Sequence, residues 1–164
     1  MRTVLYISYM NLGKTGTIGI MKKVYAQIDV LRKEKFRVYY AYVEQDVLTS
    51  NFAGLSSEHL DVKHIGRSFN HILMKQDFSQ IDCVYVRYRA FSIEFLSLLK
   101  LLHQNHIRIM VEIPTYPFVG EFRQKALDGI KKRNISSFVR YMAMSFGYPV
   151  FSRLAGKYID RIIT

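Results

Sequence analysis

Residues 107 to 121, Ile-Arg-Ile-Met-Val-Glu-Ile-Pro-Thr-Tyr-Pro-Phe-Val-Gly-Glu, decide the expected fold. An apolar strand runs to the carboxylate of Glu112 and is stopped by two prolines, which have no backbone N–H to donate to a sheet. In open α/β sheets, ligands bind beyond the carboxyl ends of the strands, so Glu112, Thr115 and Tyr116 are expected beside a binding crevice. The same residues agree equally well with a plain strand exit, in which the prolines punctuate a loop and Glu112 caps a backbone amide.

Strands and helices alternate along the rest of the chain. Apolar runs predict strands at 3–9, 36–43, 61–65, 81–87 and 107–113, and apolar residues at helical spacing predict helices at 18–33, 69–78 and 92–104. After the prolines, residues 122–146 predict one or two basic amphipathic helices broken near Gly129 or Asn134, then a short helix from Pro149 and a strand at 158–164. This order predicts a single α/β domain over residues 1–164, with a Rossmann-like, doubly wound parallel sheet and right-handed crossovers.

Charge is distributed unevenly over the 164 residues, which carry a net charge of +11. Residues 122–164 hold nine Lys and Arg against two acidic residues. Such a segment favours an anionic partner: nucleic acid, anionic lipid or a phosphorylated ligand. A basic face that is simply solvated is the structural alternative.

Several kinds of site are not expected. Cys83 is the sole cysteine, so an internal disulfide and a cysteine metal site are excluded. We expect Cys83 to be a small side chain of the core, and a single cysteine agrees with a protein of the reducing cytoplasm. The histidines show no metal-ligand spacing, and no Gly-x-Ser-x-Gly elbow is present. The amino terminus does not resemble a signal peptide, and no apolar run reaches the roughly 18 residues of a membrane span.

Two further segments are expected at the same edge as Glu112. Residues 13–19, Gly-Lys-Thr-Gly-Thr-Ile-Gly, join a strand to a helix, where backbone amides favour an anion; the alternative is a tight turn that needs glycine. The spacing matches neither a Walker A loop nor a dinucleotide fingerprint. Residues 87–89, Arg-Tyr-Arg, end another strand and are expected to line the same crevice. The structural alternative for Arg87 is an ion pair with Glu112, which would still shape the site.

The basic helical segment is a candidate membrane contact. Its candidate contact residues are Lys131, Lys132, Arg133, Phe138 and Arg140. A basic amphipathic helix can lie on an anionic bilayer, whereas the structural alternative is a helix packed on the sheet with its basic face in water. Nucleic acid competes for the same charges, but no recognised nucleic-acid-binding module is present.

These features resemble the opening of glycosyltransferase family 4. The resemblance is carried by residues 30–38, Val-Leu-Arg-Lys-Glu-Lys-Phe-Arg-Val, by 82–87, Asp-Cys-Val-Tyr-Val-Arg, and above all by 111–121. The last two look like bacterial enzymes that build capsular or exopolysaccharide, and residues 158–164 resemble the last strand before the second domain. The chain departs from the family pattern at Thr15-Gly16, where a glycine pair is usual, and at Pro-Thr-Tyr after the strand, where many relatives carry a histidine.

The resemblance implies the amino-terminal, acceptor-side half of a GT-B fold, with the donor-binding half outside this chain and little turnover by the chain alone. It also implies transfer of a sugar from a nucleotide-diphosphate donor to a lipid-linked or saccharide acceptor, without cofactor or essential metal. The resemblance further implies a protein that is bound peripherally to the anionic surface at the cytoplasmic face of the plasma membrane. Nucleic acid is not an implied partner. The rival hypotheses are a stand-alone Rossmann-like or flavodoxin-like nucleotide-binding module without transfer activity and a basic nucleic-acid-binding domain.

Sugar transfer needs a hydrogen-bonding frame for the diphosphate and stabilisation of the developing charge. Their positions make Glu112 and Thr115 the catalytic candidates, either of which would orient an acceptor hydroxyl. Position likewise makes candidates for substrate binding of Lys14, Gly16, Gly19, Arg87, Tyr88, Tyr116 and Glu121. Among these, Tyr116 would stack on a sugar face and Glu121 is an outer candidate. On this hypothesis Glu112→Ala abolishes transfer and Glu58→Ala does not.

Overall fold

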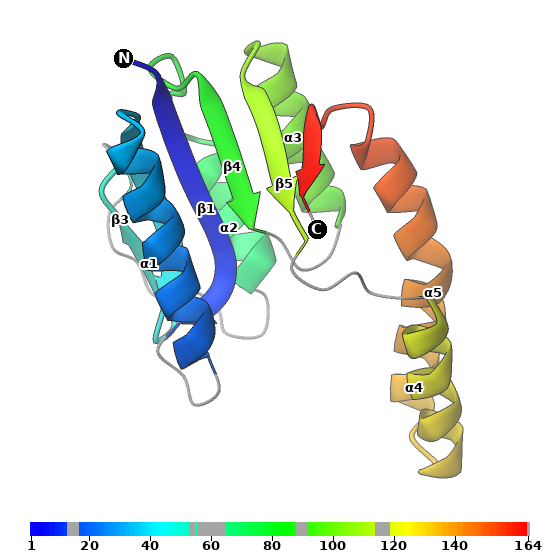
Figure 1. Cartoon of the computed structure of the whole chain (residues 1–164). Helices are drawn as coiled ribbons and strands as arrows, with labels where there is room; N and C mark the ends of the chain where they lie inside the picture. Colours follow the sequence, from blue (N-terminus) through cyan, green and yellow to red (C-terminus); the bar gives the residue numbers. More distant parts are fainter. Residues whose placement is uncertain (13–16, 53–54, 56–64, 88–91, 114–118, 164) are drawn as a thin grey trace.

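A six-stranded sheet with five helices makes up the described part of the chain (Figure 1). The computed structural model describes residues 1–12, 17–52, 55, 65–87, 92–113 and 119–163. The strands are β1 (Thr3–Leu12), β2 (Arg37–Glu44), β3 (Val47–Ser50), β4 (Cys83–Arg87), β5 (Arg108–Glu112) and β6 (Arg161–Ile163). The helices are α1 (Ile18–Lys33), α2 (Ile65–Leu73), α3 (Ile93–Gln104), α4 (Val119–Lys131) and α5 (Ile135–Ala155).

The sheet has the order β3-β2-β1-β4-β5-β6. All neighbouring pairs are parallel except β2 and β3, which form an antiparallel hairpin. Helix α1 lies on one face, and α2 and α3 lie on the other (Figure 1). The Rossmann-like α/β fold expected from the sequence is therefore confirmed, with one antiparallel edge strand added to a parallel sheet.

The direction of winding reverses between β1 and β4. From β1 the chain moves outward through β2 and β3, and then returns to place β4, β5 and β6 on the other side of β1. Right-handed crossovers put α1 on one face and the later helices on the other, as Figure 1 shows. The adjacent strands β1 and β4 thus form a topological switch point, where open α/β sheets bind their ligands.

Apolar side chains of the strands alternate between two cores. The larger core lies on the side of α2, α3 and α5 and includes Leu5, Phe69, Phe95 and Val111. The smaller core lies under α1 and includes Val4, Tyr6, Val24, Ile28 and Tyr85. Burial on both faces explains why the parallel strands read as nearly continuous apolar runs.

Several predicted boundaries need correction. The third strand is Val47–Ser50, whereas residues 61–64 lie outside the described part and Ile65 begins α2. Helix α2 begins and ends earlier than the predicted 69–78, and β1 extends to Leu12 across an irregularity between Ser8 and Asn11. Strands β4 and β5 and helices α1 and α3 match their predictions to within two residues.

Helix α5 is continuous through Pro149, where a new short helix was expected. Proline removes one helical hydrogen bond, but Ser145 and Tyr148 before it and Ala155 after it are buried, so packing on both sides of the proline stabilises α5 as one helix. The break between the two basic helices falls at residues 132–134, and Asn134 caps α5 by accepting from the backbone N–H of Ser137 at 2.9 Å.

Helices α4 and α5 form a hairpin that extends away from the sheet (Figure 1). Gly129 permits their close approach, because a Cβ at this position would lie 2.9 Å from the backbone nitrogen of Phe138. The hairpin joins the main core through Phe122 and Tyr148, whose ring centroids are 6.0 Å apart. Within the described residues, none of the helices combines the length and the apolar character that crossing a membrane requires.

Candidate functional site

The carboxyl ends of β4 and β5 lie side by side next to Ser8 of β1, which brings Arg87 and Glu112 together as expected from the sequence. Residues 13–16 of the glycine-containing segment expected at the same edge lie outside the described residues. Ser8 of β1 is the register partner of Arg87 of β4, and Arg87 is the partner of Glu112 of β5. Because these strands are parallel and adjacent, the three side chains lie on one face of the sheet, on the side of α1. Ser8, Arg87 and Glu112 therefore lie side by side at the switch point.

The carboxylate of Glu112 is the centre of a buried polar cluster. Arg87 Nη1 donates to Glu112 Oε1 at 2.8 Å, and Lys23 Nζ donates to the same oxygen at 3.0 Å. Gln27 Nε2 and Tyr85 OH donate to Oε2 at 3.0 and 2.9 Å. A carboxylate offers about four acceptor sites, so these four donors occupy its capacity. The ion pair of Arg87 with Glu112, which was the structural alternative for Arg87, is present.

A second layer holds the donors of Glu112 in place. Tyr6 OH donates to Gln27 Oε1 at 2.7 Å, which leaves the Gln27 amide nitrogen directed toward Glu112. The rings of Tyr6 and Tyr85 stack with centroids 5.1 Å apart, as befits register partners on adjacent strands. The polar cluster is thus built jointly by α1, β1, β4 and β5.

The environment keeps Glu112 ionised and the tyrosines protonated. Burial by itself raises the pKa of Glu112, but hydrogen bonds from Lys23, Gln27 and Tyr85 and the charge of Arg87 outweigh burial and lower the pKa below its usual value. Burial, reinforced by the negative charge of Glu112, raises the pKa of Tyr6 and Tyr85 far above that of a free tyrosine. At neutral pH the cluster therefore contains one carboxylate and two phenol donors.

A pocket of about 320 Å³ opens beside the cluster, between α1 and the sheet. It is lined by Tyr6, Lys23, Ala26, Gln27, Val30, Leu31 and Tyr85. The pocket is mainly apolar, with Lys23 and Gln27 as its polar groups. The side chain of Lys23 is 54% exposed, whereas that of Glu112 is 4% exposed, so Lys23 carries the accessible charge of the site. Such a pocket is large enough for a small ligand or one ring of a larger one.

The predicted site residues fall into three groups. Arg87 and Glu112 come together, as described above. Gly19 lies in the first turn of α1, and a Cβ there would meet open space, so close packing does not require glycine. Glu121 is exposed in the first turn of α4, and no hydrogen bond or ion pair between described residues joins it to Glu112. The others, Lys14, Gly16, Tyr88, Thr115 and Tyr116, lie outside the described residues.

Sequence reasoning missed Tyr6, Lys23, Gln27 and Tyr85. Period-two alternation along β4 places Tyr85 on the same face as Arg87, and this signal was available in the sequence. Lys23 and Gln27 are four residues apart on α1, hence on one face of the helix. Their separation from Glu112 by 89 and 85 residues means that only the packed fold brings these side chains together.

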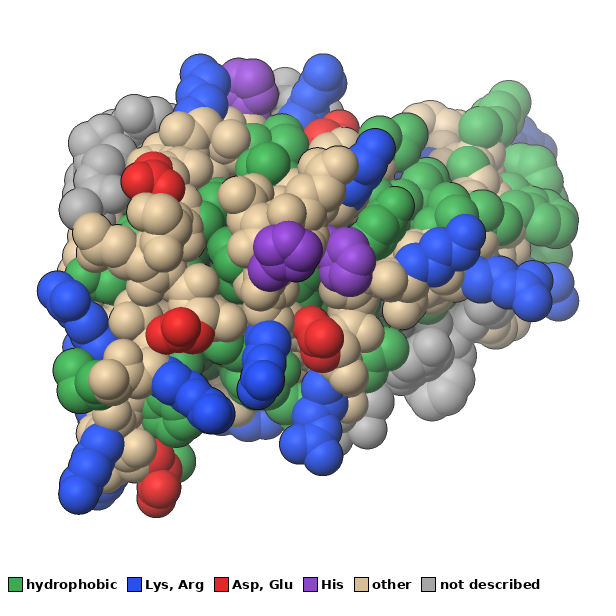
Figure 2. Space-filling view, turned by 90° about the horizontal axis from the view of Figure 1, so that it is seen from above, with side chains coloured by type: hydrophobic (Ala, Val, Ile, Leu, Met, Phe, Trp, Pro, Cys, Tyr) green, Lys and Arg blue, Asp and Glu red, His purple; other side chains and the backbone are tan. Residues whose placement is uncertain are grey.

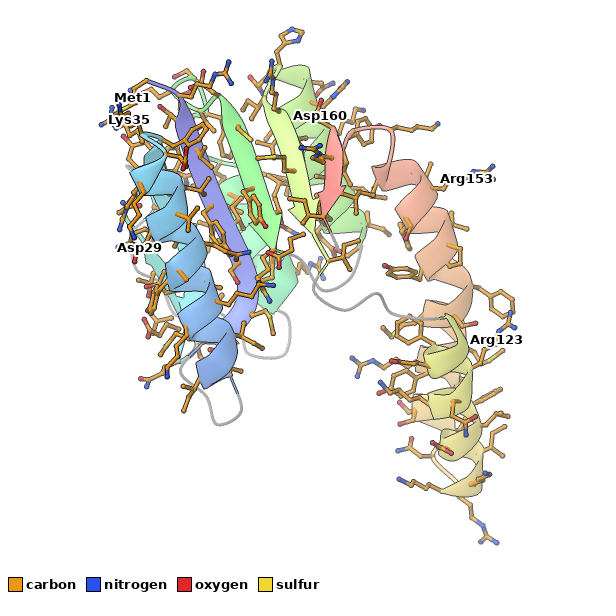
Figure 3. All side chains as sticks on the ribbon, viewed as in Figure 1. Met1, Asp29, Lys35, Arg123, Arg153 and Asp160 are labelled. Atoms are coloured by element: carbon orange, nitrogen blue, oxygen red, sulfur yellow. The ribbon has the colours of Figure 1, made fainter. Side chains whose placement is uncertain are left out.

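A second cavity, of about 510 Å³, lies at the opposite edge, where the strands begin. The two acidic residues that line it bind backbone N–H groups: Asp82 accepts from the N–H of Thr3 at 2.6 Å, and Asp160 accepts from that of Ile109 at 2.7 Å. Figure 3 labels Asp160 just before β6. These two carboxylates connect neighbouring strands, so their presence at this edge is explained by a structural role.

The described residues contain no group of three or more His, Cys, Asp and Glu side chains placed to hold a metal ion. Cys83 also lines the second cavity and is half-buried, more exposed than the core position expected for it. Burial, followed by the charge of Asp160, raises the pKa of its thiol to about 11. Cys83 is therefore protonated at neutral pH and a poor nucleophile.

No protein-family model matches the chain, and no curated protein matches it. A solved structure described as a conserved protein from Enterococcus faecalis V583 is similar, with 13% sequence identity and a TM-score of 0.44. The alignment covers 100% of this chain and 92% of that one.

Proposed function

We propose that the chain is the amino-terminal, acceptor-binding domain of a nucleotide-sugar-dependent glycosyltransferase that acts in surface polysaccharide synthesis. The observation that carries the proposal is the polar cluster at the switch point of the sheet, where α/β domains bind their ligands, together with the pocket beside it under α1. The family resemblance supplies the reaction, and the pocket supplies a place for one sugar or lipid-proximal group of the acceptor. Turnover requires a donor-binding domain as well.

Geometry favours a positioning role for Glu112. Its oxygens already accept four hydrogen bonds, so an incoming hydroxyl would compete with Lys23, Gln27, Tyr85 or Arg87. Lys23 is the exposed cation of the cluster, and the carboxylate fixes the position of its ammonium group. We assign to Lys23 the contact with an anionic part of the substrate, a phosphate of the acceptor or of the donor.

The proposal places the protein in the cytoplasm, peripherally at the inner face of the plasma membrane, where lipid-linked acceptors are available. Its partners would be a nucleotide-diphosphate sugar, bound mostly by the further domain, and a lipid-linked or saccharide acceptor. No cofactor and no nucleic acid take part.

Transfer assays on the natural gene product in its full length test the proposal. Labelled UDP-glucose, UDP-galactose and GDP-mannose are offered with bacterial membranes as the acceptor source, and label in lipid-extractable or polymeric product is counted. We expect transfer from a nucleotide sugar, and a reduction in kcat/KM of about tenfold or more in Lys23→Met. Lys22→Met removes the neighbouring exposed lysine of α1 and serves as the matched control.

The outcomes separate the hypotheses. Binding of UDP or GDP without transfer would overturn the proposal in favour of a stand-alone nucleotide-binding module. The absence of both nucleotide binding and sugar transfer would also overturn the proposal. Equal activity of Lys23→Met and Lys22→Met would remove the role assigned to Lys23.

A further inference from the structure

Helix α5 carries an apolar stripe that faces away from the sheet. Ile135, Val139, Phe146, Val150 and Leu154 are spaced by four or seven residues, so they lie along one side of the helix. The first four are 76, 58, 64 and 58% exposed. These five residues, the α5 stripe, are not needed for the core, because Ser145, Tyr148 and Ala155 form the buried side of α5.

The neighbouring helix adds to this apolar surface. Leu127 and Ile130 of α4 are also more than half exposed, so seven of the thirteen exposed large apolar side chains of the described chain lie on the hairpin. Figure 2 shows hydrophobic side chains gathered at the hairpin end of the molecule, with blue side chains beside them. Scattered exposed apolar residues are normal, but a continuous stripe marks an interaction surface.

Positive charge surrounds the stripe. Residues 119–155 carry seven Lys and Arg against Glu121 and Asp128, a net charge of +5. Lys131, Lys132 and Arg133 are exposed at the turn of the hairpin. Figure 3 labels Arg123 and Arg153 on the side of the hairpin that is turned away from the sheet. The surface thus combines apolar side chains with cations, which is the composition of helices that lie in the interface of an anionic bilayer.

We propose that the α4–α5 hairpin binds anionic phospholipid membranes by inserting the α5 stripe into the boundary between headgroups and acyl chains. The cations at the turn and beside the stripe contact the phosphates. The inference deepens the proposed function, on which its biological meaning rests, because it names the surface that would hold the acceptor domain near a lipid-linked acceptor. Phe138 is half-buried, with its backbone next to Gly129, whereas Val139 and Phe146 are exposed, so the proposed insertion uses the latter two.

Charge favours a lipid surface over the other occupants. A second copy of the hairpin would bring a net charge of +5 against +5, which opposes association. Nucleic acid would satisfy the cations but leave the α5 stripe in water. An anionic bilayer satisfies both parts of the surface.

Tryptophan fluorescence tests the insertion directly, because the 164-residue chain contains no tryptophan. Phe146→Trp places a reporter in the α5 stripe, and Ile93→Trp places one at an exposed position on α3. With vesicles containing phosphatidylglycerol, we expect the emission of Phe146→Trp to shift to shorter wavelength and that of Ile93→Trp to stay unchanged. With pure phosphatidylcholine vesicles, neither should shift.

Sedimentation with the same vesicles separates the two components of the surface. Val139→Asp should weaken binding about tenfold or more, since a charge replaces an inserted side chain. The double variant Lys131→Gln/Lys132→Gln should weaken binding and reduce its salt dependence, whereas Lys33→Gln/Lys35→Gln, at the far end of α1, should bind like the wild type. Circular dichroism checks that each variant is folded.

Three results would overturn the inference: no sedimentation with phosphatidylglycerol vesicles, equal binding to phosphatidylcholine, or equal shifts of both tryptophans. A short-wavelength emission of Phe146→Trp without vesicles, together with a doubled mass in solution, would instead identify a second copy as the occupant. Vesicle binding needs no sugar donor, so its failure is distinguishable from failure of the transfer assay.

Discussion

Glu112 and Arg87 form an ion pair in which each side chain is only 4% exposed. Removing one partner of such a pair leaves the other charge buried without compensation. We therefore expect Glu112→Gln to lower the free energy of unfolding by about 3 kcal/mol, because a neutral amide replaces the carboxylate beside buried Arg87. Urea denaturation followed by circular dichroism measures the change.

The double variant Glu112→Leu/Arg87→Met is the matched test of this explanation. Replacing both charges by apolar side chains removes the buried charge together with its partner, so the double variant should be more stable than Glu112→Gln. A double variant less stable than Glu112→Gln would mean that the wider hydrogen-bond network, and not the ion pair, dominates.

Glu112 also predicts a pH dependence of stability. Its pKa is lowered in the folded protein, so ionisation stabilises the fold above the unfolded value near 4.5, and this stabilisation is lost as pH falls through the lower folded pKa. The stability difference between wild type and Glu112→Gln should thus be constant from about pH 7 to pH 5 and shrink below about pH 4. Glu34→Gln, which removes an exposed carboxylate at the end of α1, should change stability little at every pH.

At the scale of elements, Gly129 sets the packing of α4 on α5. Alanine normally stabilises a helix relative to glycine by up to about 1 kcal/mol, but a Cβ at Gly129 would lie 2.9 Å from the backbone nitrogen of Phe138, which cannot move aside like a side chain. Gly129→Ala should therefore destabilise the protein by about 1–3 kcal/mol. Gly147→Ala, whose Cβ would make ordinary contact with the ring of Phe151, should be neutral or stabilising. Thermal unfolding of the two variants compares the signs.

Elements with a strong local pattern were predictable from the sequence. Helix α3 has its serine cap, Ser92, which accepts from the backbone N–H of Phe95 at 3.2 Å, and four buried apolar residues at helical spacing. Strand β4 is an apolar run that ends in a charge. The same local pattern placed Arg87 and Glu112 at neighbouring strand ends, which is why these two of the six residues of the cluster were foreseen.

Strand β3 escaped prediction for a physical reason. Its hairpin turn has Gln45 and Asp46 at φ of 49° and 67°, a conformation usually signalled by Asn-Gly or Asp-Gly. The turn is held from outside: the N–H of Gln45 donates to the carbonyl of Leu12 at 3.0 Å, and that of Asp46 donates to Asn11 Oδ1 at 3.2 Å. Tertiary contacts thus stabilise a turn that glycine usually stabilises, and tertiary contacts also bring Lys23 and Gln27 to Glu112. Neither kind of contact can be predicted from a local sequence pattern.

At the scale of the whole molecule, the sheet and the hairpin differ in how they are supported. Strands β1, β4 and β5 are covered by packed side chains on both faces, whereas α4 packs mainly against α5, among the described residues. Regions with few contacts to the main core open at lower free energy than the core itself. Hydrogen exchange should therefore show faster exchange for the amides of α4 than for those of β1 and β4.

Gly129→Ala makes this difference testable. If the hairpin opens independently, the substitution should speed exchange in α4 and the first turns of α5 and leave the amides of β1 unchanged. Equal acceleration throughout would show that the chain unfolds as one unit. Phosphatidylglycerol vesicles should slow exchange in α4 and α5 alone, because inserting the α5 stripe stabilises only the element that opens. The partly independent hairpin would then be the part of the molecule that responds to the membrane, while the switch-point cluster under α1 keeps its geometry.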